Sequence, residues 1–372
     1  MEIGLDMRII AFAGGLKYDG KMKLSPGRWT EGNYAALRRF LAEVRAPALA
    51  VFDWDNTCIC GDVGETFFRQ QVFSLAFRLD APALETLLPE RVNGCDAVTL
   101  AGGSFSLAEL KADILESFRS LERAGLALER CGSLAAYRRF VFDMLLLNEG
   151  LERTPGIGPE FAYVWQARLL AGFAAEELST LAEDLTWQEL HRPLADHTLS
   201  DDRRGISLHW RDGLRPYPEM GNLAAAVEER GGRVAVVTAS QPLIVAAMVE
   251  ALDFPLDALI GMELRSEDGR LTAELDSRYA VNFGEGKVAN ILAAFGIEPL
   301  LVAGDSNSDA AMLSRFPATR VRLIIDRGLS GEIETLVQKA RAGECGYLLQ
   351  PIDAETGQFA YPENARRKRQ AP

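Results

Sequence analysis

Apolar runs of strand length alternate with amphipathic segments over the second half of the chain. From about residue 217, apolar residues recur at helical spacing in the segments that lie between these runs. The strand candidates are RVAVVTAS, ALIGMEL, PLLVAGDS and VRLII, and the helix candidates are PEMGNLAAAVEERGG, PLIVAAMVEALDF and GKVANILAAFG. This order predicts a parallel sheet covered by helices on both faces, which binds ligands beyond the carboxyl ends of its strands.

The first part of the chain adds one helix and one strand to this pattern. Residues 30–45 predict a helix with Thr30 as its N-cap, and ALAVF at 48–52 predicts a buried parallel strand. Residues 58–210 are mostly helical in pattern. We therefore expect an α/β fold, a three-layer parallel sheet of the Rossmann-like kind, interrupted by a large helical insertion.

Composition and charge narrow the class of protein. The chain has 372 residues, enough for two or three compact units, with 48% hydrophobic and 25% charged residues. Its formal net charge of −13 argues against general nucleic-acid binding, because phosphates repel an acidic protein. A phosphate ligand would therefore need a local cationic patch or a metal ion.

Cysteine usage and hydropathy favour a reducing, cytoplasmic compartment. The five cysteines include no pair of CxxC units, which is typical of free thiols in a reducing environment. No apolar run approaches the length of about 18 residues that a membrane helix needs, and the N-terminus lacks the cationic start of a signal peptide. We expect a cytoplasmic protein without a nucleic-acid or membrane partner; the oligomeric state is left open.

The segment AVFDWDNTCICGD at 50–62 carries the first candidate chemistry. Asp53 and Asp55 follow the predicted strand, two residues apart. One carboxylate can attack phosphorus to form an acyl phosphate, and a second can protonate the leaving oxygen and then activate water. A hard cation such as Mg²⁺ would offset the crowded negative charge. A pair of ordinary loop aspartates would give the same short pattern.

Two further segments place a hydroxyl and an ammonium group at the ends of elements. Thr238 stands where the strand of VVTAS ends, and its hydroxyl could donate to a phosphoryl oxygen or only cap the next helix. Lys287 opens the helix of GEGKVANI, where its ammonium could screen phosphate or only face solvent. For an isolated residue, the second role is the commoner one: a helix cap for Thr238 and a solvent-exposed side chain for Lys287.

The segment LLVAGDSNSDAAML completes the set. Asp305 follows an apolar strand and a glycine, and Asp309 lies one helical turn later, so both could face one cation. A turn rich in helix caps would leave this spacing unexplained. Three strand ends and one helix start thus each carry a group suited to phosphoryl transfer, and these groups could converge at one edge of a parallel sheet.

These four motifs, DWDNT, the Thr of VVTAS, Lys287 and GDSNSD, resemble those of the haloacid dehalogenase superfamily over residues 48–325. The resemblance implies a covalent aspartyl-phosphate mechanism with Asp53 as nucleophile and Asp55 as acid and base. It also implies a phosphoryl group held by Thr238 and Lys287, to which we add Asn56 of the first motif.

The resemblance also implies a Mg²⁺ cofactor. Asp53, Asp305 and the main-chain carbonyl of Asp55 would bind the ion, and Asp309 would support either the metal or the lysine. Dehalogenases proper lack an aspartate at the position of Asp55, so the resemblance favours a phosphatase.

The large insertion between the first two motifs resembles the helical-cap class, which includes phosphoserine phosphatase and phosphorylcholine phosphatase. Phosphoserine phosphatase has an acidic residue nine positions after its nucleophile, near the substrate amine, and Asp62 holds that offset here. Glu65 is close by, and cap tryptophans suit cationic groups. We therefore expect a small phosphomonoester such as phosphocholine, phosphoethanolamine or phosphoserine. Asp62 could equally cap the helix that begins at VGETFF.

The resulting domain prediction has four parts. We expect an N-terminal segment over 1–47 with one helix, an α/β core over 48–65 and 211–350, a helical cap over 66–210 and a tail over 351–372. A phosphotransferase or mutase on the same scaffold, and a non-catalytic binding protein that keeps the fold, remain alternatives to a phosphomonoesterase.

Overall fold

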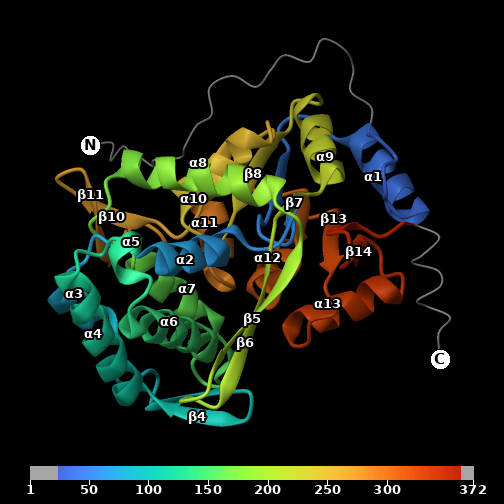
Figure 1. Ribbon diagram of the computed structural model, residues 1–372. Coiled ribbons are helices and arrows are strands. Elements are labelled where there is room, and N and C mark those ends of the chain that lie inside the picture. Colours follow the sequence, from blue (N-terminus) through green and yellow to red (C-terminus); the bar gives the residue numbers. More distant parts are fainter. Residues whose placement is uncertain (1–23, 362–372) are drawn as a thin grey trace. The chain divides into compact units, whose positions relative to one another are not determined.

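The computed structural model describes residues 24–361, which form two compact units (Figure 1). Within the described residues, the core unit comprises 24–62, Gly213–Gly261 and 278–361. The inserted unit comprises Val63–Asp212 and Met262–Ser277. Residues 1–23, the first half of the predicted N-terminal segment, and 362–372, the basic end of the predicted tail, lie outside the described part.

A seven-stranded sheet with the order β15-β14-β13-β12-β1-β8-β9 forms the centre of the core unit. All neighbouring strands are parallel except β14 and β15. The strands are β1 (Leu49–Phe52), β8 (Arg233–Val237), β9 (Ala258–Ile260), β12 (Leu301–Gly304), β13 (Val321–Asp326), β14 (Tyr347–Asp353) and β15 (Gln358–Phe359). Because β1 lies between β12 and β8, the ends of the three strands that carry the predicted motifs are neighbours. The prediction of a parallel α/β sheet is confirmed.

Helices cover the core sheet because each has an apolar face that is buried against the strands. They are α1 (Glu31–Glu43), α9 (Pro218–Glu228), α10 (Pro242–Ala251), α11 (Glu285–Phe295), α12 (Ala310–Arg315) and α13 (Glu332–Arg341), with a 3₁₀ turn η1 (Asn307–Asp309). Ile291, Leu313 and Leu336 of the last three helices pack with Val51 and Val302 in one buried cluster. The strand residues between them are equally buried, as expected for a sheet covered on both faces.

The amino end of α1 follows the sequence prediction. Thr30 is the N-cap, and its side chain accepts from the main-chain nitrogen of Asn33. The Asn33 side chain donates to the main-chain oxygen of Leu349 at 2.9 Å, which ties α1 to β14.

The sheet extends further along the sequence than predicted. The tail expected from residue 351 instead contains the end of β14 and all of β15, which pairs antiparallel with it. The buried Phe359 explains this edge strand, because its ring stacks on Tyr217 with a centroid distance of 4.4 Å and also contacts Trp29.

The inserted unit is largely helical around its own core. Its helices are α2 (Val63–Ser74), α3 (Ala81–Leu87), α4 (Leu107–Arg123), α5 (Leu128–Cys131), α6 (Ala135–Arg153), α7 (Pro159–Arg168) and α8 (Ala175–His191). Leu110, Ile114 and Phe118 of α4 pack against Phe140 and Met144 of α6. Helical spacing of these buried residues accounts for the amphipathic pattern of the sequence.

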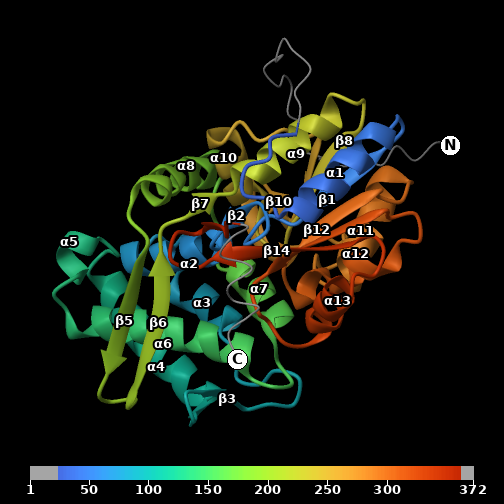
Figure 2. The same cartoon turned by 90° about the vertical axis from the view of Figure 1, so that its right-hand side faces the viewer.

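Three β-hairpins complete the inserted unit, and the sequence analysis predicted none of them. They are β3 (Ala97–Leu100) with β4 (Gly103–Ser106), β5 (Ala195–Asp201) with β6 (Ile206–Asp212), and β10 (Leu264–Glu267) with β11 (Arg270–Leu275). The long β5–β6 ribbon stands out in Figure 2. Burial along β5 alternates from residue to residue, which is a strand period, so the mostly helical prediction for residues 58–210 is wrong from Ala195 onward.

The β10–β11 hairpin also corrects the predicted boundaries. Residues 262–277 were expected in the core, but Leu271 exchanges main-chain hydrogen bonds with Gly172 and Phe173 of the inserted unit. These bonds join segments about a hundred positions apart, and no local sequence pattern predicts them. Among the described residues, no helix is long and apolar enough to cross a membrane.

Candidate active site

A tight loop follows β1 and carries the first predicted motif. The main-chain nitrogen of Asp53 still bonds to Ala303 of β12, at 2.9 Å, so this residue sits at the end of the sheet. The chain then turns back at Asn56, whose backbone is left-handed (φ 58°). Asn56 and Gly61 close the loop with two hydrogen bonds, one of them from the Gly61 nitrogen to the Asn56 side-chain oxygen at 3.2 Å. The structure thus gives Asn56 a loop-closing contact, and its phosphate contact stays a prediction.

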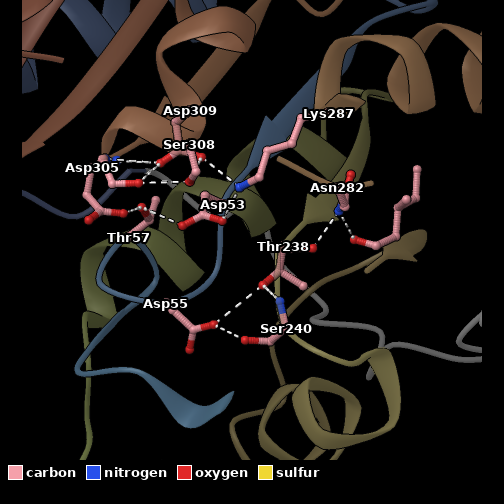
Figure 3. A network of polar contacts seen from close by, with 12 residues as sticks. Asp53, Asp55, Thr57, Thr238, Ser240, Asn282, Lys287, Asp305, Ser308 and Asp309 are labelled. Atoms are coloured by element: carbon pink, nitrogen blue, oxygen red, sulfur yellow. Dashed lines mark hydrogen bonds and ion pairs between the residues drawn. The ribbon is translucent and has the colours of Figure 1, made fainter. Parts of the chain in front are cut away.

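Asp53 lies in a buried group of charges (Figure 3). Its Oδ1 accepts from the Lys287 ammonium at 2.7 Å, and its Oδ2 accepts from the Thr57 hydroxyl at 3.3 Å. Burial, and then the nearby Asp309 carboxylate, raise the pKa of Asp53 well above its ordinary value, although Lys287 opposes them. The negative charge of Asp53 is therefore only partly balanced by the protein.

Lys287 occupies the first turn of α11 and is fully buried. Its ammonium donates to Asp53 and to Asp309, at 2.7 Å each. Burial alone would lower the pKa of this lysine, but the two carboxylates outweigh it and raise the pKa, so the group is a permanent cation. The interpretation of Lys287 as an ordinary surface lysine is excluded by this burial.

The loop after β12 is organised around Asp309. Its Oδ2 accepts from the main-chain nitrogens of Asp305 and Ser306, at 3.1 Å each, and closes a capping box with Ser306. Its Oδ1 accepts from Lys287. Of the two roles that sequence reasoning left open for Asp309, these contacts favour support of the lysine.

Asp305 is held from both sides. Its Oδ1 accepts from the Thr57 hydroxyl at 2.9 Å, and its Oδ2 accepts from the Arg327 guanidinium at 2.8 Å. Burial raises the pKa of Asp305, an effect that Arg327 opposes but does not cancel. Sequence reasoning missed Thr57, although it lies in the DWDNT motif, and Arg327, which follows β13 without any recognisable motif.

The carboxylate cluster offers the donors that a hard cation requires. One oxygen from each of Asp53, Asp305 and Asp309 lies within 4.8 Å of the others, and all three residues are buried. Carboxylate oxygens are the preferred ligands of Mg²⁺ and Ca²⁺, and a divalent cation would favour the ionised forms of Asp53 and Asp305, whose pKa values burial raises. These residues therefore fit a magnesium ion.

Asp55 faces a different set of partners, two residues beyond Asp53 (Figure 3). Its Oδ2 accepts from the Ser240 hydroxyl at 2.7 Å and, more weakly, from the Thr238 hydroxyl at 3.4 Å. Thr238 in turn accepts from the main-chain nitrogen of Ser240 at 3.0 Å, which shapes the turn after β8. The predicted residue Thr238 thus joins Asp55, and Ser240 is a partner that the sequence contained in VVTAS but reasoning did not single out.

A buried asparagine joins the strands that support this second group. The Asn282 side chain donates to the main-chain oxygens of Thr238 and Ile260, and its own oxygen accepts from Asn290 at 3.0 Å. Since Asn290 belongs to α11, this chain of bonds ties the helix of Lys287 to the ends of β8 and β9. No sequence motif marked Asn282.

The two residues predicted to recognise a substrate amine lie near the start of α2. Asp62 directly precedes this helix and Glu65 is in its first turn. Glu65 lies 3.5 Å from the Arg69 guanidinium in an i,i+4 ion pair. The position of Asp62 directly before α2 is the one that a helix cap occupies, and its contact with substrate stays a prediction.

Acidic and hydroxyl side chains at the carboxyl ends of β1, β8 and β12, together with Lys287 of α11, define an α/β enzyme with its site at a sheet edge. A sequence model described as haloacid dehalogenase-like hydrolase matches residues 132–314. This match supports the resemblance to the haloacid dehalogenase superfamily that the four motifs indicated.

Solved structures extend this comparison. A protein of unknown function from Anaerococcus prevotii DSM 20548 is 26% identical, with a TM-score of 0.79 over 93% of this chain and 98% of its own. One from Bordetella pertussis Tohama I is 18% identical, with a TM-score of 0.44 over 82% and 97%. A substrate-bound phosphoserine phosphatase is 14% identical, with a TM-score of 0.35 over 76% and 87%. No curated protein matches the chain.

Proposed function

We propose that this protein is a Mg²⁺-dependent phosphomonoesterase that acts through an aspartyl-phosphate intermediate. The observation that supports this proposal is the difference between the environments of the two carboxylates Asp53 and Asp55. Asp53 is paired with the buried Lys287 beside two further carboxylates, whereas Asp55 is held by the Ser240 hydroxyl. Phosphoryl transfer to a carboxylate needs these two environments, one that stabilises a phosphorylated nucleophile and one that handles a proton.

The chemistry follows from this arrangement in two steps. An oxygen of Asp53 attacks phosphorus while the bond to the substrate alcohol breaks, and Asp55 gives its proton to the leaving oxygen. Asp55 then takes a proton from water, which attacks the same phosphorus and releases inorganic phosphate and the free Asp53 carboxylate. Lys287 and the Thr238 hydroxyl would hold the phosphoryl oxygens throughout.

A bound Mg²⁺ would neutralise charge on the phosphoryl group and the nucleophile. Asp53 and Asp305 would bind it, together with the main-chain carbonyl of Asp55. Asp309 would keep Lys287 and the loop after β12 in place. We further propose that the inserted unit serves as a cap that restricts the site to small substrates.

Metal dependence is the first test of this function. We expect turnover of a generic aryl phosphate with Mg²⁺ and its loss in excess EDTA. Asp305→Ala should weaken Mg²⁺ binding by at least about 100-fold, since even loss of an outer partner of a ligand costs about 10–100-fold. Steady-state kinetics against Mg²⁺ concentration measure both effects. Full activity in EDTA would refute the metal requirement, and transfer to added alcohols in preference to water would indicate a phosphotransferase.

Ser240 gives a second test, directed at the acid–base group. Ser240→Ala should lower kcat by about tenfold, because Asp55 loses a hydrogen bond that fixes its carboxylate, a contact of about 1.5 kcal/mol. Ser240→Thr keeps the hydroxyl and should retain most activity. Ser314→Ala removes a hydroxyl that bonds only to the main chain of α12 in the described structure and serves as control. An unchanged kcat in Ser240→Ala would show that this contact does not position Asp55.

The substrate is proposed to be a small phosphomonoester whose alcohol carries an amine or quaternary ammonium. The support is the offset of Asp62 from Asp53 and the proximity of Glu65 in sequence. We expect a higher kcat/KM for phosphocholine, phosphoethanolamine or phosphoserine than for neutral-alcohol phosphates of similar size, and a loss of that preference in Asp62→Asn. A preference for sugar phosphates, or an unchanged order in the variant, would overturn this assignment.

A further inference from the structure

We propose that Arg327 sets the metal affinity of this site by competing with a divalent cation for Asp305. The inference rests on the proposed Mg²⁺ site and concerns a residue outside the four motifs. Arg327 directly follows β13, and its guanidinium donates to Asp305 Oδ2 at 2.8 Å. Asp305 itself is only 2% exposed. A permanent cation therefore sits on a carboxylate that the metal also needs.

The two cations of the site divide the three carboxylates between them. Lys287 is bound to Asp53 and Asp309, and Arg327 is bound to Asp305. Two positive charges thus face three carboxylates, so the cluster has a formal charge of −1 when all three are ionised and no metal is bound. Without Arg327, the same cluster would attract a divalent cation more strongly.

The exposure of the two cations separates their roles. Lys287 is completely buried between its carboxylates, whereas the Arg327 side chain is 33% exposed. When a metal binds Asp305, the guanidinium can rotate away from the carboxylate and become hydrated. The lysine ammonium is buried and has no access to solvent. Arginine stays charged at any pH at which the protein is folded, so the competition persists under all working conditions.

An arginine that only oriented Asp305 would have the opposite effect on metal binding. Removal of an orienting partner weakens binding, because the ligand is no longer preorganised. Removal of a competing charge tightens it. Thr57, which donates to the other oxygen of Asp305 at 2.9 Å, remains to orient the carboxylate when Arg327 is replaced.

The test is calorimetric titration of MgCl₂ into the metal-free full chain, without substrate. Arg327→Gln should tighten Mg²⁺ binding by roughly tenfold, the effect that Coulomb's law gives for charges of +1 and +2 a few ångströms apart in a water-like medium. Arg327→Lys keeps the charge and should stay near the wild-type affinity. Arg315→Gln removes an exposed arginine, paired with Glu285 on the same unit, and should change nothing.

Thermal unfolding supplies an independent readout. Metal-free Arg327→Gln should melt below the wild type, because Asp305 has lost its ion pair, and saturating Mg²⁺ should raise its Tm more than it raises that of the wild type. Weaker or equal Mg²⁺ affinity in Arg327→Gln would overturn the inference. Absence of Mg²⁺ binding to the wild type, or binding that survives Asp305→Ala, would instead contradict the proposed metal site.

Discussion

Asp53→Asn abolishes turnover in this account, with a loss in kcat of about 10⁴-fold or more, as for other nucleophile deletions. The amide keeps the size and shape of the carboxylate but cannot attack phosphorus at a useful rate. The measurement is steady-state hydrolysis of an aryl phosphate under saturating Mg²⁺. Glu285→Gln removes an exposed carboxylate from the first turn of α11 and should retain wild-type activity.

The stability of the same variant distinguishes lost chemistry from lost structure. Burial and the Asp309 charge raise the pKa of Asp53, so the ionised carboxylate is disfavoured in the metal-free fold. The uncharged amide should therefore melt at or above the temperature of the wild type in EDTA. A variant that is inactive because it is unfolded would melt earlier. Near-normal turnover of a pure, folded preparation would exclude covalent catalysis by this residue.

Lys287→Met should destabilise the protein by about 3–5 kcal/mol, the range for removing one partner of a buried ion pair. The variant leaves Asp53 and Asp309 buried next to each other without the ammonium that bonds to both at 2.7 Å. Urea unfolding of the metal-free protein measures the loss. Lys339→Met removes a half-exposed lysine 3.7 Å from Glu344 and should change stability by no more than about 0.5 kcal/mol.

The stability deficit of Lys287→Met should depend on pH in a defined direction. The pKa of Lys287 is raised on folding, so its contribution is fully present below the ordinary lysine value of about 10.4 and is lost only as the pH rises through the folded pKa. In Lys287→Met, the acids bind protons more readily, so the deficit should shrink on acidification. The double variant with Asp53→Asn should recover part of the stability. A deficit that is independent of pH and of Asp53 would contradict this assignment.

Much of the core unit could be predicted because its strands are short apolar runs followed at once by polar residues. Asp53, Thr238 and Asp305 stand at such points, after β1, β8 and β12, and the sheet order makes these strands neighbours. Lys287 is different, because a lysine at a helix start is usually solvated. Its role emerged only in combination with the three strand ends.

The remaining features depend on contacts that leave no local pattern. Asn282 and Arg327 act as single residues on partners far away in sequence, so neither spacing nor periodicity marks them. The β10–β11 hairpin joins the inserted unit through bonds to Gly172 and Phe173. Residues 195–212 of the β5–β6 hairpin do alternate between apolar and polar positions. This strand pattern was overlooked because the preceding segments have helical periodicity.

The central claim is that Asp53 becomes phosphorylated during turnover, and rapid acid quench followed by mass spectrometry tests it most directly. Wild-type protein mixed with Mg²⁺ and an aryl phosphate should gain the mass of one phosphoryl group within a turnover. Peptide mapping should place that group on Asp53, hydroxylamine should remove it as expected for an acyl phosphate, and Asp53→Asn should not acquire it. A wild-type enzyme that hydrolyses the substrate while Asp53 stays unmodified, or that carries the label on another residue, would contradict the account.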